Sequence, residues 1–252
     1  MLKFLKVLFI LTFAFGSGYA QKSKIKTIVI DAGHGGKDPG TSFGKLKEKN
    51  IALSITLKVG KLIEEELGIK VVYTRKKDVF IPLHERGEIA NRNKADLFIC
   101  IHVNANPYSS KIYGSETYTM GLHKTEENLE LAKRENAVIL MEDNYKKNYD
   151  FDPDSPLAHI KMANYQNAFM KQSLNLASKV EKQFQKSGRK SRGVKQAGFQ
   201  VLWETTMPGI YIETGYLTNS VDREILSTEA GQQKIAEAIV KAIRIYKEEA
   251  EK

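Results

Sequence analysis

The sequence predicts an α/β fold, a single-domain sandwich with a mostly parallel or mixed central sheet and helices on both faces. Short β-branched and apolar runs, such as residues 27–30 and 97–101, are typical of buried strands. Between them lie segments whose apolar residues repeat at helical spacing, and strands that alternate with helices favour this architecture. The 252 residues are 42% hydrophobic, which is enough for one sizeable core.

The expected elements follow one another in a regular order. A strand over residues 26–31 leads through a loop to a helix over 48–66, in which Ile51, Ile55 and Val59 repeat at helical spacing. The next expected elements are a strand over 69–74, a helix over 83–93, and strands over 96–103 and 114–120. A long helical region then precedes a strand near 199–203, a strand over 209–213 and a final helix over 229–249.

The first 20 residues have the pattern of a secretory signal peptide. Two lysines form a short basic start, residues 7–15 an apolar stretch, and Gly18-Tyr19-Ala20 a small-x-small cleavage site. The apolar stretch is shorter than the roughly 20 residues that a membrane-spanning helix needs. We therefore expect export to the periplasm or cell envelope, cleavage before Gln21, and no transmembrane segment in the mature chain, residues 21–252.

The chain is basic, with a formal net charge of +9 that falls to +7 when the signal peptide removes Lys3 and Lys6. A basic surface attracts polyanions over long range, although generic solubility explains scattered lysines equally well. In an exported protein the available partners are the cell wall and the membrane surface, so we expect no nucleic-acid partner. The densest basic cluster, residues 186–195, is expected to be a solvated loop.

Two histidines stand where apolar runs end. His34 follows the run that closes on Asp31-Ala32-Gly33, and His102 lies near the end of residues 96–103. Both imidazoles are therefore expected at the carboxyl ends of strands, where open α/β sheets keep their ligand sites. Catalytic zinc usually takes three protein ligands and leaves one position for water. Glu48, at the start of the first helix, is the candidate third ligand, although a carboxylate there also suits the helix dipole.

Glu213 is the candidate catalytic group. It ends the apolar strand that begins at residue 209, and Thr214-Gly215 follows it. A solvated surface glutamate would not need that position. Beside a zinc-bound water whose pKa the metal lowers to about 7, a carboxylate can take the proton and return it to the leaving amine.

The helix expected over 83–93 carries two further polar candidates. His84 lies on this helix and is a possible fourth metal ligand, although the sequence gives it little support. Arg86 suits either a structural role or the binding of substrate carboxylates, and we favour the structural role.

Three residues with reactive or metal-binding side chains are expected to have no part in the site. Cys100, the only cysteine, lies in a predicted strand and is expected to be a small core residue. It could instead be a nucleophile near His102, but a cysteine hydrolase would leave the other motifs unexplained. His123 and His159 have no ligand pattern near them and are expected at the surface.

Four motifs in a fixed order, spanning roughly residues 26–247, resemble the zinc-dependent N-acetylmuramoyl-L-alanine amidases of the cell-division type. They are the Asp-Ala-Gly-His-Gly-Gly-x-Asp-Pro-Gly run at 31–40, Glu48-Lys49, Ile101-His102-Val103-Asn104-Ala105 and Ile212-Glu213-Thr214-Gly215. The resemblance implies one zinc ion per chain, held by His34, Glu48 and His102, with Glu213 as the catalytic acid/base. It also implies hydrolysis of the amide between N-acetylmuramic acid and L-alanine in peptidoglycan, for cell-wall remodelling and daughter-cell separation.

The segment over about 122–165 is expected to be a helical insertion in this catalytic domain, because connections in compact α/β domains run about 2–6 residues. In division amidases an insertion here carries a helix that covers the active site until an activator protein displaces it. The resemblance makes Glu135 the residue that caps the zinc, and an exported activator with a degenerate endopeptidase-like domain the partner. The alternative is an ordinary packing helix, with Glu135 solvated and paired to Lys133 or Lys146.

Two other functions remain compatible with these residues. A zinc carboxypeptidase or aminopeptidase acting on wall peptides would use the same ligands and the same architecture. A catalytically inactive wall-binding regulator is the second alternative, but it has no chemical need to keep three ligands together with Glu213.

Overall fold

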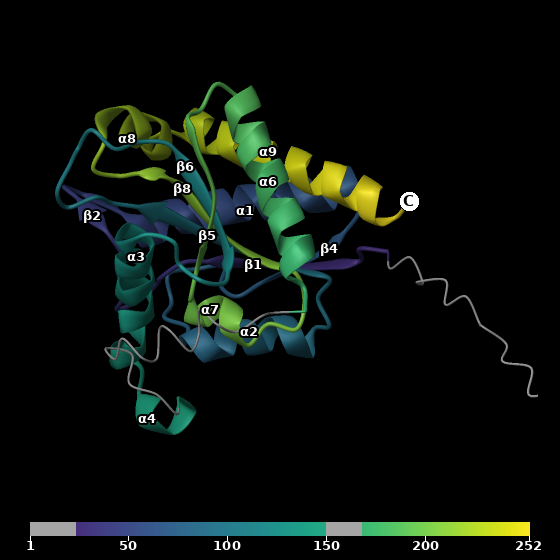
Figure 1. Ribbon diagram of the computed structural model, residues 1–252, viewed down its shortest axis with the longest axis horizontal. Coiled ribbons are helices and arrows are strands. Elements are labelled where there is room, and N and C mark those ends of the chain that lie inside the picture. Colours follow the sequence, from purple (N-terminus) through teal and green to yellow (C-terminus); the bar gives the residue numbers. More distant parts are fainter. Residues whose placement is uncertain (1–23, 150–167) are drawn as a thin grey trace, which may run out of the picture.

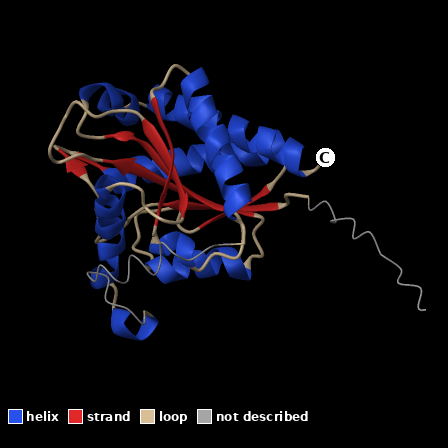
Figure 2. Ribbon diagram, viewed as in Figure 1, coloured by secondary structure: helices blue, strands red, loops and turns tan. Residues whose placement is uncertain are grey.

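The computed structural model describes residues 24–149 and 168–252, and these form one α/β unit around a six-stranded mixed sheet (Figures 1 and 2). The strand order is β4-β1-β5-β8-β6-β7. All neighbouring strands pair in parallel except β6 and β8, which are antiparallel. The strands are β1 (Thr27–Ala32), β4 (Lys70–Tyr73), β5 (Leu97–Asn104), β6 (Ser115–Met120), β7 (Ser191–Ala197) and β8 (Gly209–Tyr216).

Helices cover both faces of the sheet and enclose a core on each side, as the sequence predicts (Figure 1). One face packs against α1 (Glu48–Leu67), α6 (Met170–Lys186) and α9 (Glu229–Ala250). The other face packs against α2 (Leu83–Arg92), α7 (Gln200–Trp203) and α3 (Glu126–Asn136). The remaining elements are the short strands β2 (Ser42–Phe43) and β3 (Leu46–Lys47), the 3-10 helix η1 (Ala137–Met141), α4 (Tyr145–Asn148) and α8 (Ser220–Ser227).

The first helix is fixed at both ends by the loops beside it. The first two backbone amides of the helix donate hydrogen bonds to the preceding loop. The Glu48 amide donates to the Thr41 carbonyl at 2.9 Å, and the Lys49 amide donates to the Pro39 carbonyl at 3.2 Å. At the other end Gly68 adopts φ 63°, the left-handed conformation that ends helices and that glycine adopts without strain. The loop before the helix is therefore tied to the position from which Glu48 projects.

One predicted strand is wrong, and the loop expected over 186–195 is partly wrong. Residues 200–203 form helix α7, whereas the strand of this region is β7, residues 191–197. Strand β7 pairs only with β6 at the edge of the sheet and carries a partly exposed, basic sequence, so it lacks the alternation that identifies strands. Phe199, Val201 and Leu202 are apolar because they pack beneath the sheet from a helical turn.

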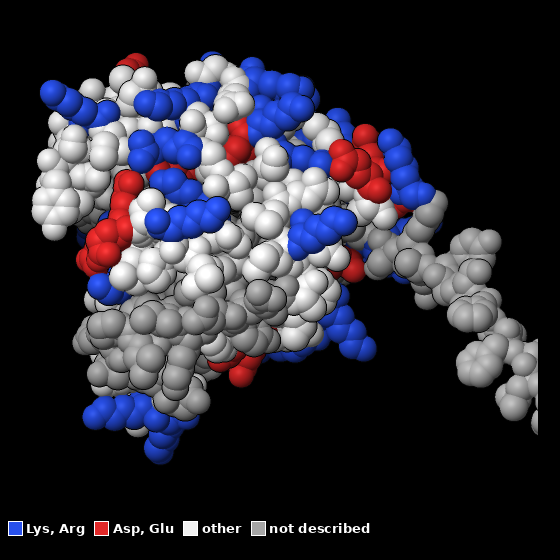
Figure 3. All heavy atoms as spheres, viewed as in Figure 1, with Lys and Arg blue, Asp and Glu red and all other residues white. Residues whose placement is uncertain are grey.

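The insertion and the chain start are described only in part. Residues 122–149 of the insertion contain α3, η1 and α4, as its expected helical character requires. The remainder of the insertion, including His159, and the expected signal peptide of residues 1–20 lie outside the described residues. Within the described ranges no helix is both long and apolar enough to cross a membrane. Lysine and arginine side chains are spread over the face seen in Figure 3, where acidic groups interrupt them.

Candidate metal centre

His34 is held in an unusual backbone conformation at the carboxyl end of β1. Its φ of 60° lies in the left-handed region that non-glycine residues seldom adopt. A tight turn supports this conformation, because Gly35 and Asp38 exchange backbone hydrogen bonds of 2.9 and 3.1 Å. The Asp38 carboxylate lies 2.7 Å from Nδ1 of His34. That contact orients the ring and leaves Nε2 pointing toward the site, an arrangement common for metal-binding histidines.

Two buried arginines hold the backbone that presents His34. Arg86 donates to the carbonyls of Ala32 at 2.8 Å and His34 at 2.9 Å, and to Asp31 at 3.0 Å. Its side chain is 1% exposed, which bears out the structural role favoured from the sequence.

Arg75 holds the same turn from its other side. It donates to the carbonyls of Gly33 at 2.6 Å and Lys49 at 2.8 Å, which ties the turn to the start of α1. Burial and the neighbouring Arg86 lower the pKa of Arg75 to about 10, so it stays charged at neutral pH.

Glu48 reaches the site from the first turn of α1 with both oxygens engaged. The amides of Thr41 and Val103 donate to Oε2 and Oε1, each at 2.8 Å. Oε1 also lies 3.2 Å from Nε2 of His34 and 3.1 Å from Nδ1 of His102. The structure therefore brings together the three residues that the sequence analysis selected as ligands.

His102 is packed between a tyrosine and a glycine. Its ring stacks on Tyr211 with a centroid separation of 4.2 Å. Gly33 lies against the ring so closely that a Cβ at residue 33 would be 2.3 Å from Nε2 of His102. Glycine is required at this position because any side chain would displace the imidazole.

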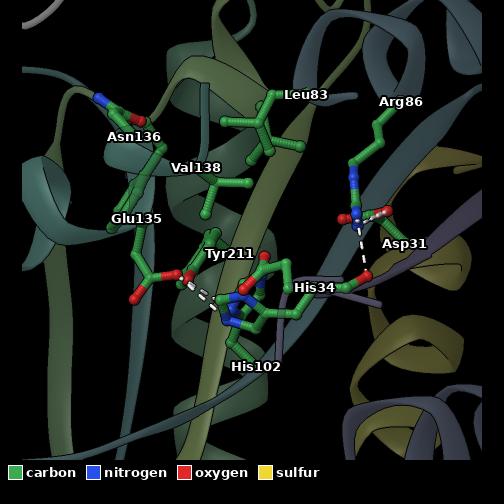
Figure 4. A pocket seen from close by; sticks show the side chains of 12 residues that line it. Asp31, His34, Leu83, Arg86, His102, Glu135, Asn136, Val138 and Tyr211 are labelled. Atoms are coloured by element: carbon green, nitrogen blue, oxygen red, sulfur yellow. Dashed lines mark hydrogen bonds and ion pairs between the residues drawn. The ribbon is translucent and has the colours of Figure 1, made fainter. Parts of the chain in front are cut away.

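Glu135 points from the end of α3 into the same cluster (Figure 4). Its Oε2 lies 3.4 Å from both His34 Nε2 and His102 Nδ1, and its Oε1 accepts a hydrogen bond from Arg134 Nε at 3.1 Å. The side chain is 7% exposed, and Lys133 pairs with Glu130 instead. The alternative interpretation from the sequence, in which Glu135 is solvated and paired to a lysine, is therefore wrong.

The cluster fits a tetrahedral metal ion such as zinc. Ligands about 2.0–2.1 Å from a tetrahedral zinc lie about 3.3 Å from one another, and the four ligand contacts given above lie between 3.1 and 3.4 Å. Among the described residues, Nε2 of His34 and Oε2 of Glu135 are buried without a hydrogen bond. Buried polar atoms are normally satisfied, and a cation would satisfy both of these.

The charges in the site already favour a cation there. Burial would lower the pKa of His34, but Glu48 and Asp38 outweigh it and hold that pKa well above the ordinary range. Burial would raise the pKa of Glu48, but His34 and His102 hold it well below its ordinary range. Without metal, a proton on His34 therefore balances Glu48. A metal ion must displace that proton, so acidification favours the metal-free protein.

A second buried group of potential ligands, Asp31, Cys100 and His102, shares His102 with the first. The side chains of Asp31 and Cys100 already have hydrogen-bond partners. The Cys100 thiol donates to Asp31 at 2.8 Å, and the Thr74 hydroxyl also donates to Asp31. Burial and then Asp31 raise the pKa of the Cys100 thiol well above its ordinary range. Cys100 is thus a buried, protonated core residue, as expected.

Glu213 lies beside the ligand cluster on β8. It is in register with His102 on β5, so both side chains leave the same face of the sheet. Glu213 is fully buried, and neither of its oxygens has a hydrogen-bond partner among the described residues. Burial, followed by Glu48 and Glu135, raises its pKa well above the ordinary range. An unpaired carboxyl group with a raised pKa is suited to exchange protons with a substrate.

Two of the other histidines lie away from the cluster. His84 Nδ1 is 3.2 Å from Glu142 Oε2 and 3.3 Å from the Tyr149 hydroxyl, so the structure places it in a different hydrogen-bonded group. His84 is therefore outside the cluster, and the carboxylate of Glu135 contacts His34 and His102 instead. His123 is partly exposed.

Sequence reasoning missed several supporting residues. Asp38 had a signal, because it lies four residues after His34 in a glycine-rich turn and can reach its ring. No sequence pattern indicated Arg75 or Tyr211, because their contacts join segments that are far apart in the chain.

Comparison with known proteins places this geometry in a family. A family model described as N-acetylmuramoyl-L-alanine amidase matches residues 28–245. The N-acetylmuramoyl-L-alanine amidase AmiA of Escherichia coli is 34% identical over 235 residues, covering 90% of this chain and 78% of AmiA. The amidase AmiC of the same species is 33% identical over 236 residues, covering 91% of this chain, which spans only 54% of the length of AmiC.

A solved structure has the same fold. The CwlD amidase of Clostridioides difficile, determined in complex with the GerS lipoprotein, superposes with a TM-score of 0.65 at 28% identity. The match covers 88% of this chain and 98% of CwlD.

Proposed function

This chain belongs to the N-acetylmuramoyl-L-alanine amidase family, and we propose that it uses one zinc ion to hydrolyse the bond between N-acetylmuramic acid and L-alanine in peptidoglycan. The observation that carries the proposal is the buried cluster of His34, Glu48 and His102 beside the unpaired carboxyl group of Glu213. Export to the periplasm or cell envelope, and a role in wall remodelling and daughter-cell separation, belong to the same proposal.

The residues divide the reaction between them. Two imidazoles and the Glu48 carboxylate would hold zinc, which supplies polarisation of the amide carbonyl and a water molecule with a pKa of about 7. Glu213 takes a proton from the attacking water as the water oxygen bonds to the carbonyl carbon. The same carboxyl group then protonates the amide nitrogen as the C–N bond breaks. The products are the lactyl carboxylate on the sugar and a peptide with a free L-alanine amine.

Digestion of purified peptidoglycan tests this function directly. The mature protein is incubated with zinc or with a chelator, and the released fragments are identified by mass spectrometry. We expect zinc-dependent release of peptides that begin with a free L-alanine. Shortened stem peptides would instead support the carboxypeptidase or aminopeptidase alternative. Wall binding without cleavage, by zinc-loaded wild type and by the open variant described below, would support the inactive regulator.

The position of Glu135 supports a second part of the proposal, an internal inhibitor. Its carboxylate lies against both histidines, at the point where water and substrate must enter. A ligand that competes there keeps the enzyme closed, and a partner that binds the open form better shifts the population toward activity. We propose an exported activator that displaces the insertion helix. CwlD, which was solved bound to a lipoprotein, provides a precedent for a partner protein.

Replacing Glu135 with alanine should raise basal peptidoglycan hydrolysis without an activator. The carboxylate would no longer compete for the metal, and a tenfold rise would correspond to a closed-state bias of about 1.4 kcal/mol. Dye release from labelled peptidoglycan measures the rate, and zinc content and thermal melting are measured on the same sample. Lys133→Ala, a change on the same helix that removes only the ion pair with Glu130, is the matched control. A folded, zinc-loaded Glu135→Ala protein with unchanged or reduced activity would contradict the inhibitor.

A further inference from the structure

Tyr211 carries a buried hydroxyl group that has no part in the function proposed so far. The residue lies on β8, two positions before Glu213, so the two side chains leave the same face of the strand. Tyr211 is 1% exposed, and its hydroxyl has no hydrogen-bond partner among the described residues. Buried polar atoms are normally satisfied, and an unpaired one costs stability. The hydroxyl is therefore expected to have a partner in the working enzyme.

Packing accounts for the ring of Tyr211 but not for its hydroxyl. The ring is stacked between His102, at a centroid separation of 4.2 Å, and Phe199, at 4.1 Å. A phenylalanine ring would make both of these contacts equally well. The stacking therefore explains an aromatic side chain at this position, whereas the oxygen needs a separate reason.

The Tyr211 side chain lines the cavity at the metal centre, together with His34, His102 and Glu135 (Figure 4). Tyr211 belongs to the central sheet, whereas Glu135 belongs to helix α3 of the insertion. Displacement of α3 removes the carboxylate of Glu135 from the cavity and leaves the tyrosine in place. The hydroxyl then faces the group that replaces this carboxylate beside the two histidines.

In the proposed hydrolysis that group is the carbonyl of the scissile amide. The Glu135 carboxylate lies 3.4 Å from each histidine, at the point where the carbonyl must be polarised. Negative charge develops on the carbonyl oxygen as water attacks, and fixed donors aimed at this oxygen lower the barrier. A tyrosine hydroxyl is a donor of this kind and keeps its proton at neutral pH.

We propose that Tyr211 is a further catalytic residue, whose hydroxyl donates a hydrogen bond to the carbonyl oxygen of the scissile amide in the transition state. The inference rests on the amidase function proposed above. Tyr211 transfers no proton, because Glu213 carries out both proton transfers. The two unpaired groups of β8 thus act on the same amide, Tyr211 at its oxygen and Glu213 at its nitrogen.

Tyr211→Phe tests this role, because it removes the hydroxyl and keeps the stacked ring. The change is made in wild type and in Glu135→Ala, and both proteins are loaded with zinc. The rate on a saturating soluble muramoyl peptide should fall about 10²- to 10³-fold, the usual effect of losing one such donor, with little change in KM. Zinc content should stay at one ion per chain. The melting temperature should not fall, since the lost hydroxyl has no partner in the part of the chain that the structure describes.

Binding of a transition-state analogue gives a readout that does not depend on turnover. A phosphinate analogue of the muramoyl–alanine linkage carries a negatively charged oxygen on a tetrahedral centre, in place of the carbonyl. Isothermal titration should show that Tyr211→Phe weakens its binding by about tenfold or more, the scale of one lost hydrogen bond to a charged group. Tyr246→Phe is the matched control, because this buried tyrosine lies on α9, against the opposite face of the sheet. It should change neither the rate nor the binding.

A folded, zinc-loaded Tyr211→Phe protein with an unchanged rate or unchanged binding of the phosphinate would overturn the proposal. A raised KM at an unchanged saturated rate would also overturn it, since the hydroxyl would then serve ground-state binding. Loss of zinc would assign the hydroxyl to the metal site instead. Failure of the amidase function is seen separately, as the absence of free L-alanine amino termini when wild type and Glu135→Ala digest peptidoglycan.

Discussion

His102→Ala is expected to lose bound zinc and hydrolysis together. His102 supplies one of the three ligands, and the activated water depends on the same ion, so both properties disappear with one side chain. Loss of an outer partner of a metal ligand usually weakens metal affinity by about 10–100-fold, and loss of the ligand itself should exceed that range. Zinc content by elemental analysis and release of L-alanine amino termini are the two measurements. His34→Ala and Glu48→Ala should behave in the same way.

The control for this experiment is His123→Ala, which removes a partly exposed histidine that belongs to neither group of potential metal ligands. It should keep one zinc ion per chain and full activity. Circular dichroism of the metal-free proteins separates loss of metal from loss of fold, since Tyr211 packs directly against the His102 ring. A folded His102→Ala protein that retains one zinc ion per chain would remove His102 from the proposed ligand set.

The position of these ligands could be predicted from the sequence because of the way parallel strands end. β1 and β5 are parallel neighbours, so the residues after Ala32 and near Asn104 meet at the same edge of the sheet. Glu48 could be predicted because it opens a long amphipathic helix that must pack across that sheet. For the two histidines a local pattern located each residue and the rule for strand ends brought them together, whereas the ligand role of Glu48 came from the family motifs on either side of it.

The support around the ligands could not be predicted in this way. Arg75 and Arg86 hold the turn at His34 by donating to backbone carbonyl groups. Every residue has such a carbonyl, so the sequence does not show which ones accept these hydrogen bonds. The left-handed conformation of His34 is likewise a result of those contacts and of Asp38. Such contacts join segments some 40 to 50 residues apart, so only the folded chain reveals them.

The edge of the sheet was mispredicted for a different reason. Arg192 and Lys195 on β7 form ion pairs with the buried Glu116. These ion pairs hold the strand to the sheet, although its basic sequence resembles that of a solvated loop. The apolar run after it was then assigned to the strand, although it forms α7. An edge strand that is partly exposed along most of its length does not show the alternation on which sequence reasoning depends.

Glu213→Gln is expected to keep its zinc and to lose at least about 10²-fold in turnover, the usual scale of general acid–base catalysis. Glutamine preserves the shape of the side chain but cannot exchange the proton between water and the leaving amine. Glu213 lies beside the ligand cluster on a neighbouring strand, so the ligands should be undisturbed. Zinc content and single-turnover rates on a soluble muramoyl peptide are the measurements, and the exposed Glu224→Gln is the matched control.

The stability of the metal-free variant gives a second, independent readout. The folded protein raises the pKa of Glu213 above the value of about 4.3 for an unfolded chain, so the folded state binds this proton more tightly. Ionising Glu213 therefore costs stability, and this cost grows as the pH rises from that value toward the folded-state pKa. Glu213→Gln removes the charge and should melt at least as high as wild type at neutral pH. A variant that loses activity but keeps its stability and its zinc identifies Glu213 as a proton-transfer group. A folded Glu213→Ala protein without zinc would instead make Glu213 a metal ligand.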